Sequence, residues 1–151
     1  MKIYIASSWK NETAVLAFAI LLRSWGHQVD CFCDTTTTGR FVFHPRMLGV
    51  NPEELDAVSF LALPQAQKVF IEDRKWIDWA DLVIMYLPCG KSSHLEAGYA
   101  AGKGKLLFIF SPGGFPKGEY DAMYGFADVL CNSLGTLKYT LEDYSKEIIK
   151  I

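Results

Sequence analysis

Glu96 is the residue whose type and surroundings best fit covalent chemistry. It closes residues 90–96 (GKSSHLE), which follow an apolar run. Amides and hydroxyls at the start of a helix favour an anionic or polar ligand. We expect the Glu96 carboxylate, about one turn into that helix, to stay ionised at neutral pH and to point into a cleft, as a nucleophile must.

The spacing of Glu96 also has a purely structural interpretation. Ser93 and Glu96 stand three residues apart, as in a capping box, where the serine side chain accepts from one free amide and the glutamate reaches back to another. If Glu96 were only a cap, its loss would cost about 1 kcal/mol of stability and leave activity unchanged. Spacing alone leaves both interpretations open.

Asp73 is the second acidic candidate. Its spacing to Trp76, Ile77 and Ala80 puts it on the buried face of a helix that precedes an apolar strand. An acid on a buried face requires a partner or a function. The structural alternative is an ion pair in the neighbourhood of Arg74, or a contact with the dipole of another element.

Short apolar strands alternate with helical periods, and these elements must position the two acids. We predict strands at residues 2–6, 29–33, 82–87, 105–110 and 129–131. Helices are predicted from the turn at 7–12 to Gly26, from Asn51 to Pro64, from there to Ala80, from Ser92 to Gly102, and from Thr140 as an N-cap onward. The pattern predicts a single domain over residues 1–151: an α/β, doubly wound, five-stranded parallel sheet in a flavodoxin/Rossmann-like three-layer sandwich.

A doubly wound sheet binds its ligand outside the carboxyl ends of the strands, near the point where the strand order reverses. Four loops are predicted there, at residues 7–11, 34–40, 88–93 and 111–117, and they hold most of the Ser, Thr and Gly outside helices. The connection over residues 34–49 is long, and loops of this length are usually functional. His44 within it is a candidate cover for the site.

Composition excludes several classes of partner. The formal net charge of −2, without a Lys/Arg cluster, argues against a nucleic acid polymer. The apolar run at residues 14–22 is less than half of the roughly 20 residues needed to cross a bilayer. Cys31 and Cys33 share a predicted strand face, but no second motif completes a zinc shell. We predict no metal, no cofactor, no membrane span or signal peptide, and a cytoplasmic location with reduced thiols.

Three stretches together resemble the nucleoside 2-deoxyribosyltransferase-like family. They are residues 2–8 (KIYIASS), the run D-x-x-W-x-x-x-A-D from Asp73 to Asp81 before an apolar strand, and residues 90–105 (GKSSHLEAGYAAGKGK). The resemblance spans nearly the whole chain, with residues 34–63 unplaced. It implies cleavage or exchange at the N-glycosidic bond of a nucleoside or a nucleoside 5′-monophosphate.

The resemblance also implies roles for individual residues. The glutamate matching Glu96 attacks the anomeric carbon and forms a glycosyl-enzyme intermediate, which water or a second base then releases. The aspartate matching Asp73 orients and protonates the base, and the tyrosine matching Tyr4 lies beside the nucleophile. An ionised carboxylate suits an oxocarbenium-like transition state, and a neighbouring acid suits the leaving base.

One position departs from the transferases, which carry an aspartate where this chain has Gly90. The branch that hydrolyses deoxynucleoside monophosphates is matched instead at the first turn, where Ser8 and Lys10 stand at its phosphate-binding serine and arginine. Trp9 is a candidate wall for the base or sugar. The substrate-binding residues expected on this basis are Ser7, Ser8, Trp9, Lys10, Gly90, Lys91, Ser92 and Ser93.

Other functions remain open at this point. A module that senses a nucleotide without chemistry would use the same pocket, a flavin or mononucleotide carrier would fit the fold, and cleavage of the nicotinamide bond of NAD would use the same glutamate. The resemblance further implies a homodimer or a higher homo-oligomer. We expect residues 123–132 (MYGFADVLCN) to contribute to the pocket of a neighbouring copy.

Overall fold

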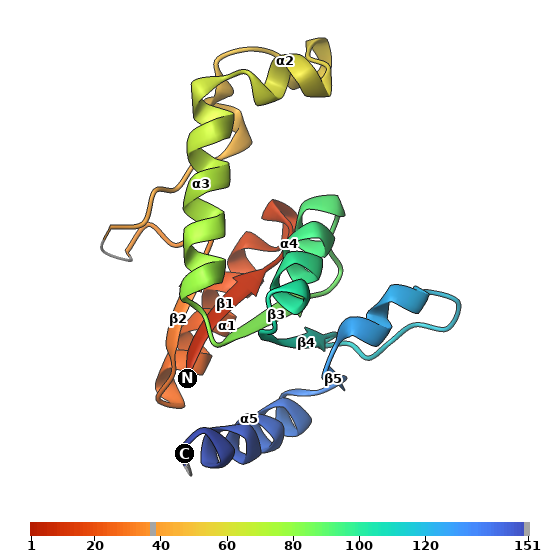
Figure 1. Cartoon of the computed structure of the whole chain (residues 1–151). Coiled ribbons are helices and arrows are strands. Elements are labelled where there is room, and N and C mark those ends of the chain that lie inside the picture. Colours follow the sequence, from red (N-terminus) through yellow and green to blue (C-terminus); the bar gives the residue numbers. More distant parts are fainter. Residues whose placement is uncertain (37–38, 150–151) are drawn as a thin grey trace.

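A computed structural model describes residues 1–36 and 39–149 of the chain (Figure 1). In these residues five parallel strands form one sheet in the order β2-β1-β3-β4-β5. The strands are β1 (Lys2–Ala6), β2 (Gln28–Cys31), β3 (Leu82–Tyr86), β4 (Leu106–Phe110) and β5 (Val129–Cys131). The predicted α/β class, the strand number and the parallel arrangement are confirmed.

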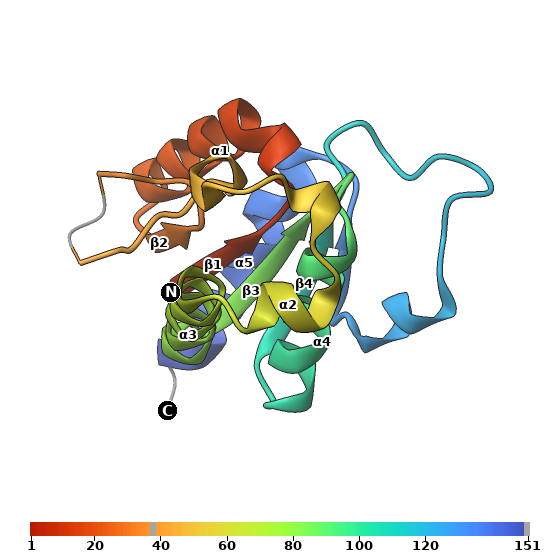
Figure 2. The same cartoon turned by 90° about the horizontal axis from the view of Figure 1, so that it is seen from above.

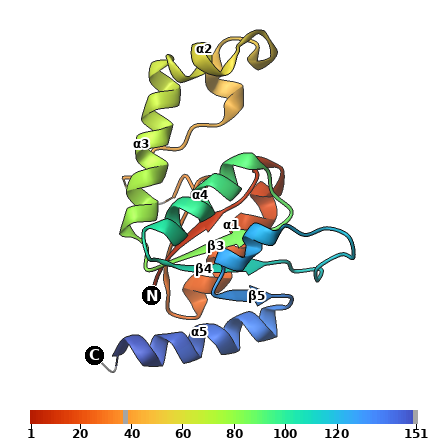
Figure 3. The same ribbon diagram turned by 45° about the vertical axis from the view of Figure 1, so that its right-hand side comes forward.

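Helices cover both faces of the sheet. Helix α1 (Glu12–Ser24) and helix α5 (Leu134–Ile149) pack on one face, and α3 (Pro64–Trp79) and α4 (Lys91–Gly102) pack on the other. Figure 3 shows α3 and α4 on the opposite side of the sheet from α5. The first four residues of β3 (LVIMY) are buried, as a strand between two helical layers requires. The predicted three-layer sandwich is therefore confirmed.

The strand order reverses between β1 and β3, the central pair. Tyr4 of β1 is the register partner of Asp30 on β2 and of Val83 on β3. Register partners in a parallel sheet point to the same face, and Tyr4 and Val83 both pack under α3 and α4. A site at the reversal point is therefore formed by side chains on the α3–α4 face, near the carboxyl ends of β1 and β3.

The connection from β2 to α3 leaves the body of the molecule. It contains the 3₁₀ turns η2 (Pro45–Leu48) and η3 (Pro52–Glu54) and the short helix α2 (Ala57–Leu61). In Figure 1, α2 and the first turns of α3 project beyond the sheet. The prediction of one helix from Asn51 to Pro64 is wrong: Asn51 caps η3 only, and Asp56 caps a separate α2 by accepting from the Ser59 amide at 2.7 Å.

Two other predicted boundaries also need correction. Strand β2 ends at Cys31, so Cys33 lies in the following turn, although the Sγ atoms of Cys31 and Cys33 are still 3.9 Å apart. Helix α5 begins at Leu134 rather than at Thr140, because the Ser133 hydroxyl accepts from the Thr136 amide at 3.1 Å. Thr140 lies within the helix, and its hydroxyl donates back to the Thr136 carbonyl.

The loops after β1 and β4 contain further turns. The 3₁₀ turn η1 (Trp9–Asn11) follows β1, and η4 (Ala122–Phe126) precedes β5. Figure 2 shows the long segment from β4 to η4 swinging out from the sheet. Among the described residues, none of the helices has the length and apolar content needed to span a membrane.

Candidate active site

Tyr4, Asp73 and Glu96 come together from three elements on the α3–α4 side of the sheet. Tyr4 lies on β1 with no exposed surface, Asp73 on α3 and Glu96 on α4. Burial raises the pKa of the Tyr4 phenol, and the charges of Glu96 and Asp73 raise it further. The three groups are therefore close enough to influence one another electrostatically.

The protonation state of Glu96 differs from the expectation. Burial, followed by the charge of Asp73, raises its pKa to about 8, and the Tyr4 hydroxyl and Arg40 oppose that rise. Glu96 is the sixth residue of α4, so it lies beyond the first turn, where the field of the helix N-terminus is strongest. The expectation of a fully ionised carboxylate at neutral pH is wrong, because desolvation outweighs the helix.

The carboxyl group of Glu96 also has spare hydrogen-bonding capacity. Its Oε2 atom is buried and, within the described residues, has no hydrogen-bond partner; the same holds for the Tyr4 hydroxyl. The two groups lie close enough to shift each other's pKa without an aligned hydrogen bond between those atoms. Polar atoms left in this state inside a protein are expected to meet water or a ligand.

The capping-box interpretation of Glu96 is wrong. The N-cap of α4 is Gly90, without a side-chain capping bond, and Ser93 is the third helical residue, with 1% of its surface exposed. A capping box needs its serine at the N-cap and its glutamate three residues later. Glu96 is too far along α4 to reach the free amides, so a capping role does not account for it.

Asp73 does form an ion pair, but with a distant partner. Arg40 Nη2 donates to Asp73 Oδ1 at 2.7 Å, whereas the sequence pointed to the neighbourhood of Arg74. Burial raises the pKa of Asp73, and Arg40 counteracts that rise. The Asp73 side chain remains 23% exposed, whereas the side chain of its partner Arg40 has no exposed surface.

Three further charged residues surround this group, and the sequence reasoning missed them. Arg40 Nε lies 3.4 Å from Asp30 Oδ1, and Arg40 Nη1 lies 4.0 Å from Glu72 Oε1. Burial raises the pKa of Asp30 to about 7. The signal for Asp30 was available, since an acid interrupts the apolar strand at Val29-Asp30-Cys31. We call Tyr4, Asp30, Arg40, Glu72, Asp73 and Glu96 the acidic cluster.

The loops after β1 and β3 are tied together beside the acidic cluster. The Ser7 hydroxyl donates to the Tyr86 carbonyl at 2.9 Å, and Asn11 Nδ2 donates to the Pro88 carbonyl at 2.6 Å and to Ser7 Oγ at 3.1 Å. Ser8 caps η1 by accepting from the Lys10 amide at 3.2 Å. Ser7 therefore has a structural role at this rim, and Ser8 has one as well.

The other predicted binding residues occupy different parts of the rim. Trp9 packs edge-on against Phe32 and His44, with ring centroids 5.0 and 4.5 Å apart, so the loop carrying His44 does reach the first loop. Trp9 is half-buried in this packing. Ser93 is buried in α4. The exposed members of the predicted set are Lys10, Gly90, Lys91 and Ser92.

A cavity of about 380 Å³ lies between the loops after β3 and β4. Its lining includes Pro88, Cys89, Ser111 and Tyr124. Two of the four predicted loops, at residues 88–93 and 111–117, thus share a cavity, and the Asn11 bond joins the first loop to the same rim. In the described part of the chain, no three His, Cys, Asp or Glu side chains are arranged to hold a metal ion.

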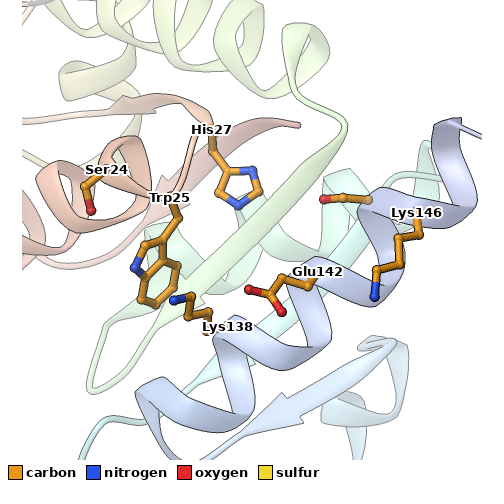
Figure 4. A pocket seen from close by; sticks show the side chains of 7 residues that line it. Ser24, Trp25, His27, Lys138, Glu142 and Lys146 are labelled. Atoms are coloured by element: carbon orange, nitrogen blue, oxygen red, sulfur yellow. The ribbon is translucent and has the colours of Figure 1, made fainter.

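A cavity of about 450 Å³ lies at the opposite ends of the strands (Figure 4). Figure 4 shows Lys138, Glu142 and Lys146 along one side of α5, facing Trp25 and His27. Lys138 Nζ lies 5.6 Å from the centre of the Trp25 ring. Neither cavity takes a lining residue from the acidic cluster, but this one also takes none from the four predicted loops, so it is separate from the candidate rim.

Among the comparisons with known proteins, the solved structures identify the fold. No protein-family model matches the chain, and no curated protein matches it. A 2-deoxyribosyltransferase from Bacillus psychrosaccharolyticus superposes with a TM-score of 0.62 at 22% identity, over 91% of this chain and 90% of that one. A CMP N-glycosidase from Clostridium botulinum superposes with a TM-score of 0.56 at 15% identity, over 94% and 99%.

Both neighbours are of the kind that the sequence motifs resemble, and both match nearly the whole chain. At these identities the likeness establishes the fold. The chain is therefore built on the fold of the nucleoside 2-deoxyribosyltransferase-like proteins.

Proposed function

We propose that this chain cleaves or exchanges the N-glycosidic bond of a nucleoside or nucleoside 5′-monophosphate, with Glu96 as the nucleophile. The observation that carries the proposal is the convergence of Tyr4, Asp73 and Glu96 at the point where the strand order reverses, with Glu96 Oε2 buried and unpartnered in the described structure. The two structural neighbours, a 2-deoxyribosyltransferase and a CMP N-glycosidase, support an enzyme of this class.

In the first step the ionised Glu96 carboxylate attacks C1′ of the sugar. The C1′–N bond breaks, its electron pair leaves with the base, and Asp73 delivers a proton to the base. In the second step water attacks C1′ and gives a proton to Asp73, which lost its own in the first step, while the ester bond to Glu96 breaks and the sugar is released. A second base that attacks in place of water, and gives its N–H proton to Asp73, yields transfer. The Tyr4 hydroxyl stabilises the ionised form of Glu96, because it lowers the pKa of that carboxyl.

A 5′-phosphate fits the part of the rim where Lys10 and Lys91 lie. Lys91 and Ser92 begin α4, whose N-terminus lacks a side-chain cap, and amides in that position favour an anion. The bond from Asn11 to the Pro88 carbonyl brings the loop of Lys10 to the start of α4. In this arrangement the base lies toward Asp73 and the phosphate toward Gly90.

We further propose that the chain works as a homodimer or higher homo-oligomer in the cytoplasm. Exposed apolar side chains support assembly: Phe70 and Ile71 on α3 are 59% and 58% exposed, and Met123 and Phe126 near η4 are 63% and 62% exposed. Residues 123–132 are the segment proposed to reach a neighbouring site. The four cysteines are free, which suits a reducing compartment.

The test is release of free base from a panel of ribo- and deoxynucleosides, their 5′-monophosphates and NAD, followed by chromatography. We expect the wild type to release base and Glu96→Gln to be slower by on the order of a thousandfold, since several kcal/mol of transition-state stabilisation are lost. Glu142→Gln, an exposed change on α5, is the matched control and should retain the wild-type rate.

Each outcome discriminates between the candidate functions. Base released equally by the wild type and by Glu96→Gln would remove Glu96 as the nucleophile. Release from NAD alone would favour the glycohydrolase. Binding of a nucleotide without release from any compound would favour a sensing module.

A further inference from the structure

Arg40 is the one cation among the described members of the acidic cluster, and it comes from the long loop after β2. Its side chain is fully buried. The guanidinium meets Asp30 of β2 at 3.4 Å on one side, and Asp73 at 2.7 Å and Glu72 at 4.0 Å of α3 on the other. Arg40 thus bridges the sheet and the helix that carries the candidate acid.

This arrangement is a poor source of stability. The side chains of Arg40 and Asp30 are both completely removed from solvent, and the loss of hydration of the two charges opposes folding before any pairing. Among the described residues, Arg40 Nε and Nη1 and both carboxylate oxygens of Asp30 have no aligned hydrogen-bond partner. A buried pair with unsatisfied atoms contributes little to folding, so its presence beside Tyr4 and Glu96 points to a role in the site.

The contacts between the loop and α3 leave Asp73, rather than Glu72, as the hydrogen-bond partner of Arg40. Glu72 Oε1 already accepts from the Phe41 amide at 3.0 Å and from Trp76 Nε1 at 2.8 Å. Asp73 has Arg40 as its partner within the described contacts. Asp73 is 23% exposed, whereas Asp30 and Arg40 have no exposed side-chain surface, so only Asp73 of these three can touch a substrate.

We propose that Arg40, anchored by Asp30, is a positioning residue that holds the Asp73 carboxyl beside Glu96 and offsets the excess negative charge of the acidic cluster. Neither Arg40 nor Asp30 contacts the substrate. The proposal rests on the proposed function, because it assigns Arg40 to the same site. It also gives the long loop a role: the loop supplies the buried guanidinium that reaches both Asp30 and Asp73.

The electrostatics of the cluster agree with this assignment. Glu96 faces Tyr4 from β1, Asp30 from β2, Asp73 from α3 and Arg40 from the loop. Arg40 lowers the pKa of Glu96, of Asp73 and of Asp30, against the burial that raises all three. Without Arg40 these carboxyls would hold their protons to higher pH, whereas removal of the Asp30 charge would act on Glu96 in the opposite direction.

The test compares Arg40→Met, Arg40→Lys and Asp30→Asn with Arg74→Met, an exposed arginine next to Asp73 in sequence. Carbon-13 NMR of the carboxyl groups follows the titration of Glu96, and the pH profile of base release gives kcat and KM. We expect Arg40→Met to raise the titration midpoint of Glu96 by about one pH unit or more and to lower kcat more than it raises KM.

Arg40→Lys separates charge from geometry. Lysine keeps the charge but lacks the planar fork that reaches Asp30 and Asp73 together, so it should restore much of the titration midpoint and little of kcat. Asp30→Asn should lower the midpoint of Glu96 and still reduce kcat, because Arg40 loses its anchor. Opposite shifts from Arg40→Met and Asp30→Asn are not a result that general loosening of the fold produces.

An unchanged Glu96 midpoint in Arg40→Met, or a kcat loss no larger than that of Arg74→Met, would overturn the proposal. If Arg40→Met does not fold, the Glu96 midpoint and kcat of the near-isosteric Asp30→Asn and the charge-conserving Arg40→Lys test the proposal in its place. A wild type that releases no base from any compound would refute the proposed function. The NMR titration would then still show whether Arg40 sets the charge state of the acidic cluster.

Discussion

At the scale of single residues, the candidate site depends on a balance between burial and charge. Burial raises the pKa of Glu96 to about 8 and that of Asp30 to about 7, while Arg40 lowers both. Under the proposed function, a nucleophile whose protonated form prevails at neutral pH lies next to the acid that gives the leaving base its proton. In that function the resting site holds protons and becomes reactive only as Glu96 ionises.

Glu96→Gln should stabilise the protein in a pH-dependent way. The pKa of Glu96 is about 8 when folded, against 4.5 as a reference, so the folded state binds more protons between these values and its free energy of unfolding falls as pH rises. In Glu96→Gln this titration is absent, so the variant does not show this fall in the free energy of unfolding. Denaturant melts should show little difference near pH 5 and a gain on the order of 3 kcal/mol for the variant at pH 8.

A constant difference between the two proteins across that pH range would show that Glu96 titrates normally in the fold. Glu142→Gln is the control here as well, because Glu142 is exposed on α5, on the other face of the sheet from Glu96.

Tyr4→Phe should move the pH profile without weakening the fold. The Tyr4 hydroxyl lowers the pKa of Glu96, so its loss should shift the acidic limb of kcat/KM upward by about 0.5–1 pH unit. The hydroxyl is buried without an aligned partner in the described structure, so its removal should leave the free energy of unfolding unchanged or raise it by about 1 kcal/mol.

Tyr144→Phe on α5 is the matched change, since that ring packs on Phe108 across the sheet from the acidic cluster. It should leave the pH profile unchanged. An equal shift in both variants, or no shift in Tyr4→Phe, would show that the Tyr4 hydroxyl does not act on the pKa of Glu96.

At the scale of elements, strands were easier to predict than helix starts and loops. Strands β1 and β5 match their predicted bounds, because continuous apolar runs between helices have one stable placement. The start of α5 was misplaced because Thr140 and Ser133 are both good caps, and sequence does not say which one ends the loop after β5. Local propensity decides such boundaries only together with tertiary packing.

Ser133→Ala and Thr140→Ala test where α5 begins. Ser133 Oγ accepts from the Thr136 amide, so its loss should cost about 1 kcal/mol of stability. Thr140 is inside the helix, where alanine is the better helix former, so Thr140→Ala should be neutral or slightly stabilising. Thermal denaturation of the two variants checks this directly. The reverse order of stabilities would put the helix start at Thr140.

Tyr4, Asp73 and Glu96 were predictable because their motifs are local, but Arg40 was not. Its pairing with Asp73 joins positions 33 residues apart and depends on how the long loop returns to α3. The Glu96 protonation state was also out of reach, because it reflects burial together with the charges and the hydroxyl of residues from four other segments. Residue types showed which groups could react, and tertiary structure determined their charge.

At the scale of the whole molecule, one part of the chain stands apart from the three layers. Helix α2 and the first half of α3 extend beyond the sheet (Figure 1), and several of their apolar side chains are exposed. Val58 and Leu61 on α2 are 80% and 60% exposed, and Phe70 and Ile71 on α3 are similarly open. Apolar groups gathered on a projecting arm mark an interaction surface more often than chance exposure does.

We expect this arm to be buried between two copies of the chain. Light scattering coupled to size exclusion should give at least twice the chain mass for the wild type, and Phe70→Asp combined with Ile71→Lys should give the mass of one chain. Ile20→Lys is the control, because Ile20 is 65% exposed on α1, in the layer opposite α3. It should leave the assembly intact.

The mass of the wild type and the masses of the variants answer different questions about the site. A monomeric wild type would remove the neighbouring copy from the proposed pocket, and residues 123–132 would then serve their own chain, where Tyr124 already stacks on His94 with ring centroids 6.0 Å apart. Dissociation by Ile20→Lys but not by the arm variant would place the interface on the α1–α5 face. Dissociation by the arm variant with a parallel loss of base release would show that the site is completed in the assembly, because the arm leads directly into the helix that carries Asp73.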